Sequence, residues 1–141
     1  MSTLNRAKEK LLKENYTCVL IKEDSIFCSR ERGVKPLVQF VLSKEDFKDY
    51  FAADKVIGKA TAFLYCILQV KKIYVSIISK VALDILVRNS IEVEYDLLVD
   101  NIRNRKNDGL CPFEEAVLDV EDSKLALEII LSKMKEMNIS I

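Results

Sequence analysis

The chain has 141 residues, of which 50% are hydrophobic and 31% are charged, and its 22 lysines and arginines balance 22 aspartates and glutamates. This composition predicts one soluble domain over residues 1–141 that can bury its own core, and the zero net charge argues against a nucleic-acid partner. The apolar runs are too short to span a bilayer, and the first residues lack the apolar core of a signal peptide. We therefore expect a cytoplasmic protein that does not bind membranes.

The first half of the chain combines helical patterns with an antiparallel hairpin. The β-rich stretches on either side of Glu23-Asp24 predict the hairpin, and the segment that ends at Leu68 is apolar nearly all round, which is typical of a central helix. A loop is expected through Tyr50. The predicted elements of this half are a helix over Leu4–Glu14, strands over Tyr16–Ile21 and Ser25–Ser29, a helix beginning at Pro36, and a helix over Val56–Leu68.

The second half predicts a strand, a helix and another strand, followed by a final helix. Such a strand-helix-strand unit requires parallel pairing and a right-handed crossover, so the whole chain is predicted to be an α/β sandwich with a mixed sheet. The predicted elements of this half are a strand over Ile73–Ile78, a helix over Lys80–Arg88 capped by Ser79 and closed by Asn89 in a left-handed conformation, a strand over Ile91–Val99, and a helix from Asp122 or Ser123.

Histidine is absent from the sequence. It is the commonest general acid–base residue and the commonest zinc ligand, so Ser-His-Asp catalysis, Cys-His catalysis and imidazole zinc sites are excluded. The four cysteines contain no Cys-x-x-Cys pair and predict reduced thiols. If Lys22 pairs with Ser25 in the hairpin, Cys18 faces away from Cys28, which argues against a disulfide between them. We expect neither a metal nor another cofactor.

Two polar clusters are the candidate functional segments. The first, Asp54-Lys55-Val56-Ile57-Gly58-Lys59-Ala60, lies at the start of the predicted central helix. Gly58 and Lys59 could present backbone N–H groups and an ammonium group to a phosphate or carboxylate there, although Gly58 could equally permit close helix packing. Asp54 is either the helix N-cap or a carboxylate that contacts a ligand, and Lys55 lies beside it.

The second cluster runs from Asn101 to Glu115, a turn-rich connection between apolar segments. Asn104 and Arg105 could bind a carboxylate or phosphate, or Arg105 could pair on the surface with Asp108 or Glu114. If Pro112 begins a helix, Cys111 lies at its positive end, where it is either a nucleophile or a buried structural thiol. Glu114 is a candidate catalytic carboxylate, although acidic residues in a first helical turn also stabilise the helix dipole.

These two clusters, together with Arg30-Glu31-Arg32-Gly33 before Pro36-Leu37, resemble the DUF1893 family of uncharacterised proteins. The resemblance implies a cytidine deaminase-like three-layer sandwich. In that superfamily the zinc site forms at the N-termini of two helices. The corresponding helix starts in this chain would be Asp54–Lys59 and Ser79-Lys80, and neither holds a histidine or a cysteine. In Cys111-Pro112 the cysteine precedes the proline, which is the reverse of the order in the zinc motif of that superfamily. Zinc-dependent deamination is therefore not expected.

Three functions remain open at this point. The first is the binding of a small anionic or nucleotide-like molecule in a pocket formed by Asp54, Lys59, Asn104 and Arg105, and this is the function we favour. The second is an enzyme of unfamiliar chemistry that uses Cys111, Lys59 or a carboxylate. The third is a catalytically silent interaction module, and a homodimer is compatible with each of the three. Whether the protein is an enzyme is left undecided by the sequence.

Overall fold

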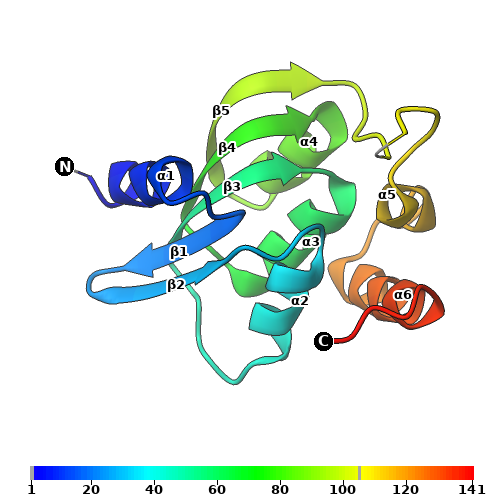
Figure 1. The fold of residues 1–141 in the computed structure, drawn as a ribbon, viewed down its shortest axis with the longest axis horizontal. Coiled ribbons are helices and arrows are strands. Elements are labelled where there is room, and N and C mark those ends of the chain that lie inside the picture. The colour runs from blue at the N-terminus through cyan, green and yellow to red at the C-terminus, as the bar shows by residue number, and fades with distance from the viewer. Residues whose placement is uncertain (1, 105) are drawn as a thin grey trace.

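The computed structural model describes residues 2–104 and 106–141. Within them, five strands form one mixed sheet in the order β2-β1-β3-β4-β5, with six helices around it (Figure 1). The strands are β1 (Cys18–Lys22), β2 (Ser25–Ser29), β3 (Phe51–Ile57), β4 (Lys72–Ser79) and β5 (Glu92–Val99). The helices are α1 (Thr3–Lys13), α2 (Lys35–Leu42), α3 (Lys59–Leu68), α4 (Lys80–Arg88), α5 (Pro112–Ala116) and α6 (Ser123–Glu136).

The N-terminal hairpin has the predicted register. Lys22 pairs with Ser25, so that Cys18 lies opposite Ser29 and Val19 lies opposite Cys28. Because neighbouring positions on a strand point to opposite faces of the sheet, the two cysteine side chains enter different hydrophobic clusters. All four cysteines are free thiols.

Strand β3 lies at the centre of the sheet, where the sequence predicted no strand: the expected loop ran through Tyr50 and the expected helix began at Val56. The strand pairs antiparallel with β1 and parallel with β4. Val56 and Ile57 therefore end a strand, and the central helix begins at Lys59 rather than at Val56. Alanine, aspartate and lysine are rare in strands, and the two neighbouring strands supply the hydrogen bonds that the local composition does not favour. Asp54 is consequently a strand residue, and Gly58 takes the N-cap position of α3.

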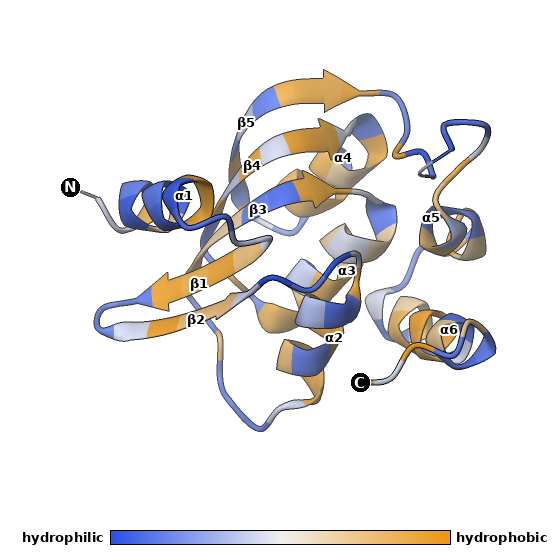
Figure 2. Ribbon diagram, viewed as in Figure 1, coloured by the Kyte–Doolittle hydropathy of each residue, from blue (hydrophilic) through white to orange (hydrophobic). Residues whose placement is uncertain are grey.

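Helices cover both faces of the sheet. On one face, α1 packs Leu4, Ala7 and Leu11 against strand residues that include Val19 and Tyr74. On the opposite face lie α2, α3 and α4, and α6 packs against α3 (Figure 1). Hydrophobic residues are concentrated on the strands, and hydrophilic residues are concentrated on the connections between elements (Figure 2). The molecule is therefore a mixed α/β protein with a helix layer on each side of one sheet.

The parallel strand-helix-strand unit predicted for the second half is present as β4-α4-β5. Ser79 caps α4 as expected, because its Oγ accepts the backbone N–H of Ala82 at 3.3 Å. Asn89 does not adopt the predicted left-handed conformation, since its φ is −97°; the following residue, Ser90, turns the chain with a φ of 64°. No helix in the described part of the chain is long and apolar enough to cross a membrane.

Candidate functional site

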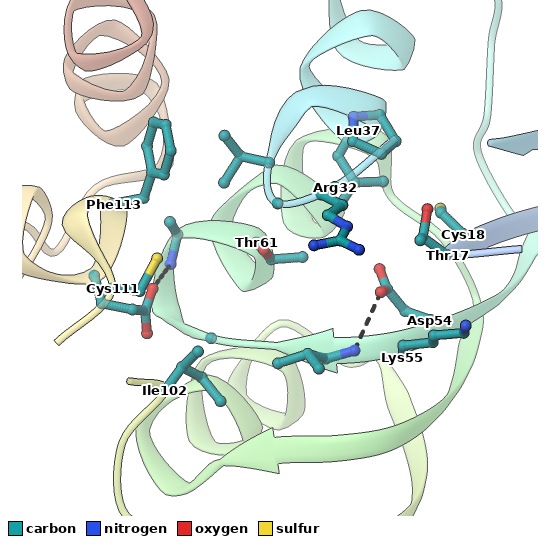
Figure 3. A pocket seen from close by; sticks show the side chains of 17 residues that line it. Thr17, Cys18, Arg32, Leu37, Asp54, Lys55, Thr61, Ile102, Cys111 and Phe113 are labelled. Atoms are coloured by element: carbon teal, nitrogen blue, oxygen red, sulfur yellow. Dashed lines mark hydrogen bonds between the residues drawn. The ribbon is translucent and has the colours of Figure 1, made fainter. Parts of the chain in front are cut away.

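A cavity of about 260 Å³ lies between the N-termini of α2 and α3, next to the strands β1 and β3 (Figure 3). The segment that follows β5 forms its remaining wall. The lining residues are Thr17, Cys18, Arg32, Gly33, Val34, Pro36, Leu37, Asp54, Lys55, Val56, Gly58, Ala60, Thr61, Ile102, Cys111, Phe113 and Glu114. Apolar side chains make up much of this wall, with a few polar groups that converge on it, as is usual for small-molecule sites.

Asp54 is the polar group that the sheet positions most firmly. Central strand β3 places its carboxyl group on the cavity wall with only 8% of the residue exposed. The Tyr65 hydroxyl donates to Asp54 Oδ2 at 2.7 Å, and the backbone N–H of Val56 donates to Oδ1 at 3.4 Å. Burial raises the pKa of Asp54 from 3.8 to about 7, although these hydrogen bonds oppose the shift. Near neutral pH the group can therefore either accept or donate a proton.

Behind Asp54 lies a buried pair of polar side chains. The Tyr65 hydroxyl is 3.5 Å from Cys18 Sγ, so that Cys18, Tyr65 and Asp54 form one hydrogen-bonded chain from the core to the cavity. Burial raises the pKa of both the Cys18 thiol and the Tyr65 hydroxyl, which keeps them uncharged. The chain therefore holds the Asp54 carboxyl in one orientation without adding a second charge.

Arg32 faces Asp54 across the cavity, and the sequence did not identify it as a site residue. Its guanidinium group points toward the Asp54 carboxyl (Figure 3), yet among the described residues it forms no salt bridge. The Thr17 hydroxyl ties the loop before Arg32 to β1, because it lies 2.9 Å from Ser29 O and 2.6 Å from Glu31 O. The sequence had singled out this loop only as part of the family resemblance.

The N-terminus of α3 already carries an anion, the side chain of Glu114. Its carboxylate accepts the backbone N–H of Lys59 at 2.6 Å and that of Ala60 at 2.8 Å. A Cβ atom at Gly58 would lie only 2.3 Å from Glu114 Oε1, so glycine is needed for this close approach. The pKa of Glu114 is raised by burial, against the effect of the two N–H groups. The anion position predicted at Gly58 is thus filled by the protein itself.

The Lys59 ammonium group turns away from the cavity toward the loop after α5. It donates to Leu118 O at 2.9 Å and lies 3.7 Å from Glu121 Oε1. Together with the Glu114 carboxylate, these contacts fasten the segment after β5 to the start of α3. Lys59 is therefore engaged in holding the cavity wall in place.

The remaining predicted residues are arranged in different ways. Lys55 lines the cavity, but its side chain extends away from it (Figure 3) and donates to Asn15 Oδ1 at 2.8 Å. Asn104 is not among the lining residues and bonds instead to Asp108, with Nδ2 2.8 Å from Oδ1. Arg105 lies outside the described residues. The second predicted cluster therefore contributes to the cavity through Ile102, Cys111, Phe113 and Glu114 rather than through Asn104.

Cys111 lines the cavity from the N-cap position of α5. Pro112 is the first residue of that helix, as the sequence predicted, and the backbone N–H of Cys111 donates to Ile102 O at 3.1 Å. Residues 2–104 and 106–141 contain no group of three or more histidine, cysteine, aspartate or glutamate side chains that could hold a metal ion.

Fold and site together define a mixed α/β protein with a small cavity between two helix N-termini. The family model for the domain of unknown function DUF1893 (TM1506) matches residues 6–134, and the chain belongs to this family. The crystal structure of a DUF1893 family protein from Thermotoga maritima is similar, with a TM-score of 0.86 and 28% sequence identity over 93% of this chain and 89% of the other. No curated protein matches the chain.

Proposed function

We propose that this protein binds a small anionic or nucleotide-like molecule in the cavity between α2 and α3. The observation that carries the proposal is the pair formed by Asp54 and Arg32, which face one cavity from opposite walls without a salt bridge between them. A guanidinium group suits an anionic or acceptor group of a ligand, and a carboxyl group with a pKa of about 7 suits a ring nitrogen or an amine.

The proposal includes a cytidine deaminase-like fold. What supports it is that the cavity lies at the N-termini of two helices, which is where the resemblance places the functional site. The two helices are not the expected ones, because the second helix N-terminus at the cavity is that of α2 and not the one at Ser79-Lys80. Within the described residues, the side chains do not fit a zinc ion. Binding without zinc is therefore the primary activity of this proposal.

An enzyme is the second candidate, and one observation favours it. A buried carboxyl group with a pKa of about 7 in a cavity can act as a general acid or base near neutral pH. In this case Asp54 would move the proton, with Cys111 and Glu114 on the opposite wall. Both Glu114 oxygens accept short backbone hydrogen bonds, whereas, among the described residues, Asp54 Oδ1 accepts only the 3.4 Å bond from Val56, so Asp54 is the better candidate of the two carboxyl groups.

A thermal-shift screen of nucleosides, nucleotides, sugar phosphates and simple anions tests the proposal. A ligand at a hundred times its dissociation constant should stabilise the protein by about 2.7 kcal/mol, a shift of several degrees for this size. The ligand-induced shift should shrink in Asp54→Asn and in Arg32→Ala. Arg88→Ala is the matched control, because Arg88 is an exposed arginine on α4 that pairs with Asp84 and does not line this cavity in the described part of the chain.

A ligand whose shift is the same in all four proteins would not bind in this cavity and would contradict the proposal. We also propose that residues 1–141 act as one domain, because α1 packs on the sheet and α6, near the other end of the chain, packs against α3 in the core that the sheet shares. A homodimer and a cytoplasmic location stay predictions; the mass in solution tests the first, and the location of a tagged protein in the cell tests the second.

A further inference from the structure

A second cavity, of about 450 Å³, adjoins the first. Arg32, Val34 and Phe113 line both of them, so the two cavities are neighbours that share these side chains. The other residues that line the second cavity are Arg30, Glu31, Lys35, Met134 and Ile139. A ligand that occupies the first cavity could therefore extend past Arg32 into the second.

The second cavity carries an excess of positive charge. Three cationic side chains line it against one carboxylate, that of Glu31, which lies 3.6 Å from Lys35 Nζ. The Arg30 guanidinium group is turned toward the end of α1, where it stacks over the Tyr16 ring at 4.0 Å and donates to Glu14 O at 3.0 Å, so that Arg32 and Lys35 are the cationic groups most directly available to a ligand. Among the described residues no side chain caps the N-terminus of the adjacent helix α2, so the dipole of this helix adds to the positive potential.

The part of the first cavity that lies beside Asp54 and Glu114 is, in contrast, unfavourable for an anionic group. Glu114 already occupies the N–H groups at the start of α3, and Asp54 becomes negatively charged above a pH of about 7. An anionic group of the ligand would be repelled by both carboxylates there. It would be attracted on the far side of Arg32, where Arg30 and Lys35 lie.

We propose that the second cavity is the anion subsite of the ligand, and that the ligand has two parts. An uncharged ring with hydrogen-bonding groups lies in the first cavity beside Asp54. A phosphate monoester lies in the second, between Arg32 and Lys35, where a doubly charged group with three acceptor oxygens matches two cationic donors. This inference rests on the proposed function and specifies its ligand class as a phosphorylated small molecule rather than a free base or a simple anion.

Matched pairs of ligands test the subsite. The probes are adenosine, guanosine, cytidine and uridine, each compared with its 5′-monophosphate, together with ribose 5-phosphate, by titration calorimetry at one salt concentration. For at least one pair, the phosphate should tighten binding by about 10-fold or more. Lys35→Ala should remove most of that gain and leave the affinity for the nucleoside unchanged. Lys44→Ala, an exposed lysine beyond the other end of α2, should change neither affinity.

The outcomes separate this inference from the proposed function. The subsite would be overturned if nucleosides bind through Asp54 but their 5′-monophosphates bind no more tightly. It would also be overturned if the gain in affinity from the phosphate survives Lys35→Ala. Either result would leave the first cavity as the binding site. Ribose 5-phosphate that binds as tightly as the nucleotides, with the same dependence on Lys35, would support the subsite and identify a sugar phosphate as the source of the anion. No binding by any of these probes would overturn the subsite, and only a thermal-shift screen without a hit would overturn the proposed function as well.

Discussion

Replacing Asp54 by asparagine should make the protein less sensitive to pH between 5 and 8. In the folded protein the pKa of this carboxyl group is about 7, whereas its ordinary value is 3.8. The folded state therefore holds a proton on Asp54 over a pH range in which the unfolded chain has released it. Stability must fall as pH rises through this range and level off above pH 7. Asparagine keeps an oxygen for the Tyr65 hydroxyl and cannot titrate, so the variant lacks this loss.

The expected size follows from the two pKa values. Between pH 5 and pH 8, proton linkage with a folded pKa of about 7 and an unfolded pKa of 3.8 removes about 2.5 kcal/mol of unfolding free energy from the parent protein. The absolute stability of the variant also includes the new contacts of the amide group. These contacts do not change with pH, so the comparison between the two pH values isolates the titration of Asp54.

Urea denaturation at pH 5 and at pH 8 measures the effect. The free energy of unfolding of the parent should drop by about 2.5 kcal/mol more than that of Asp54→Asn between the two conditions. Asp119→Asn, which alters an exposed carboxyl group, should follow the parent. If Asp54→Asn and the parent lose stability in parallel, Asp54 is already ionised at pH 5, and the argument from burial is wrong.

Two further predictions concern the contacts around the cavity. Gly58→Ala should destabilise the protein by about 2 kcal/mol or more, because the added Cβ would overlap the Glu114 carboxylate. Gly109→Ala is the control and should destabilise much less, since the added Cβ would lie 3.7 Å from its nearest neighbouring atom. In a Glu114→Ala background, which lacks that carboxylate, Gly58→Ala should lower the free energy of unfolding by less. Urea denaturation of the two single variants and the double variant measures this, and additive effects would contradict the contact. Tyr65→Phe removes a donor to Asp54 and should raise the pKa of that carboxyl group further, which a carbon NMR titration measures; an unchanged pKa would refute the role of the hydroxyl.

Local patterns in the sequence determined several elements in advance. The two-residue turn at Glu23-Asp24 set the register of the β1–β2 hairpin, and Ser79 marked the start of α4. Asp122 likewise caps α6, where its side chain accepts the backbone N–H of Leu125 at 2.9 Å. Each of these features depends on residues a few positions apart, so the composition of a short segment is enough to predict it.

Contacts between distant segments decided the rest. The residues of β3 have low strand propensity, and only pairing with β1 and β4 makes them a strand, which removes the helix-cap alternative for Asp54 and places it on a cavity wall. Glu114 meets the N–H group of Lys59 across 55 positions of sequence, and no spacing rule relates the two. The absence of histidine, by contrast, was fixed by composition and excluded imidazole chemistry outright. The chemistry that is ruled out can therefore be read from the sequence alone, while the site that remains depends on long-range packing that only the folded chain creates.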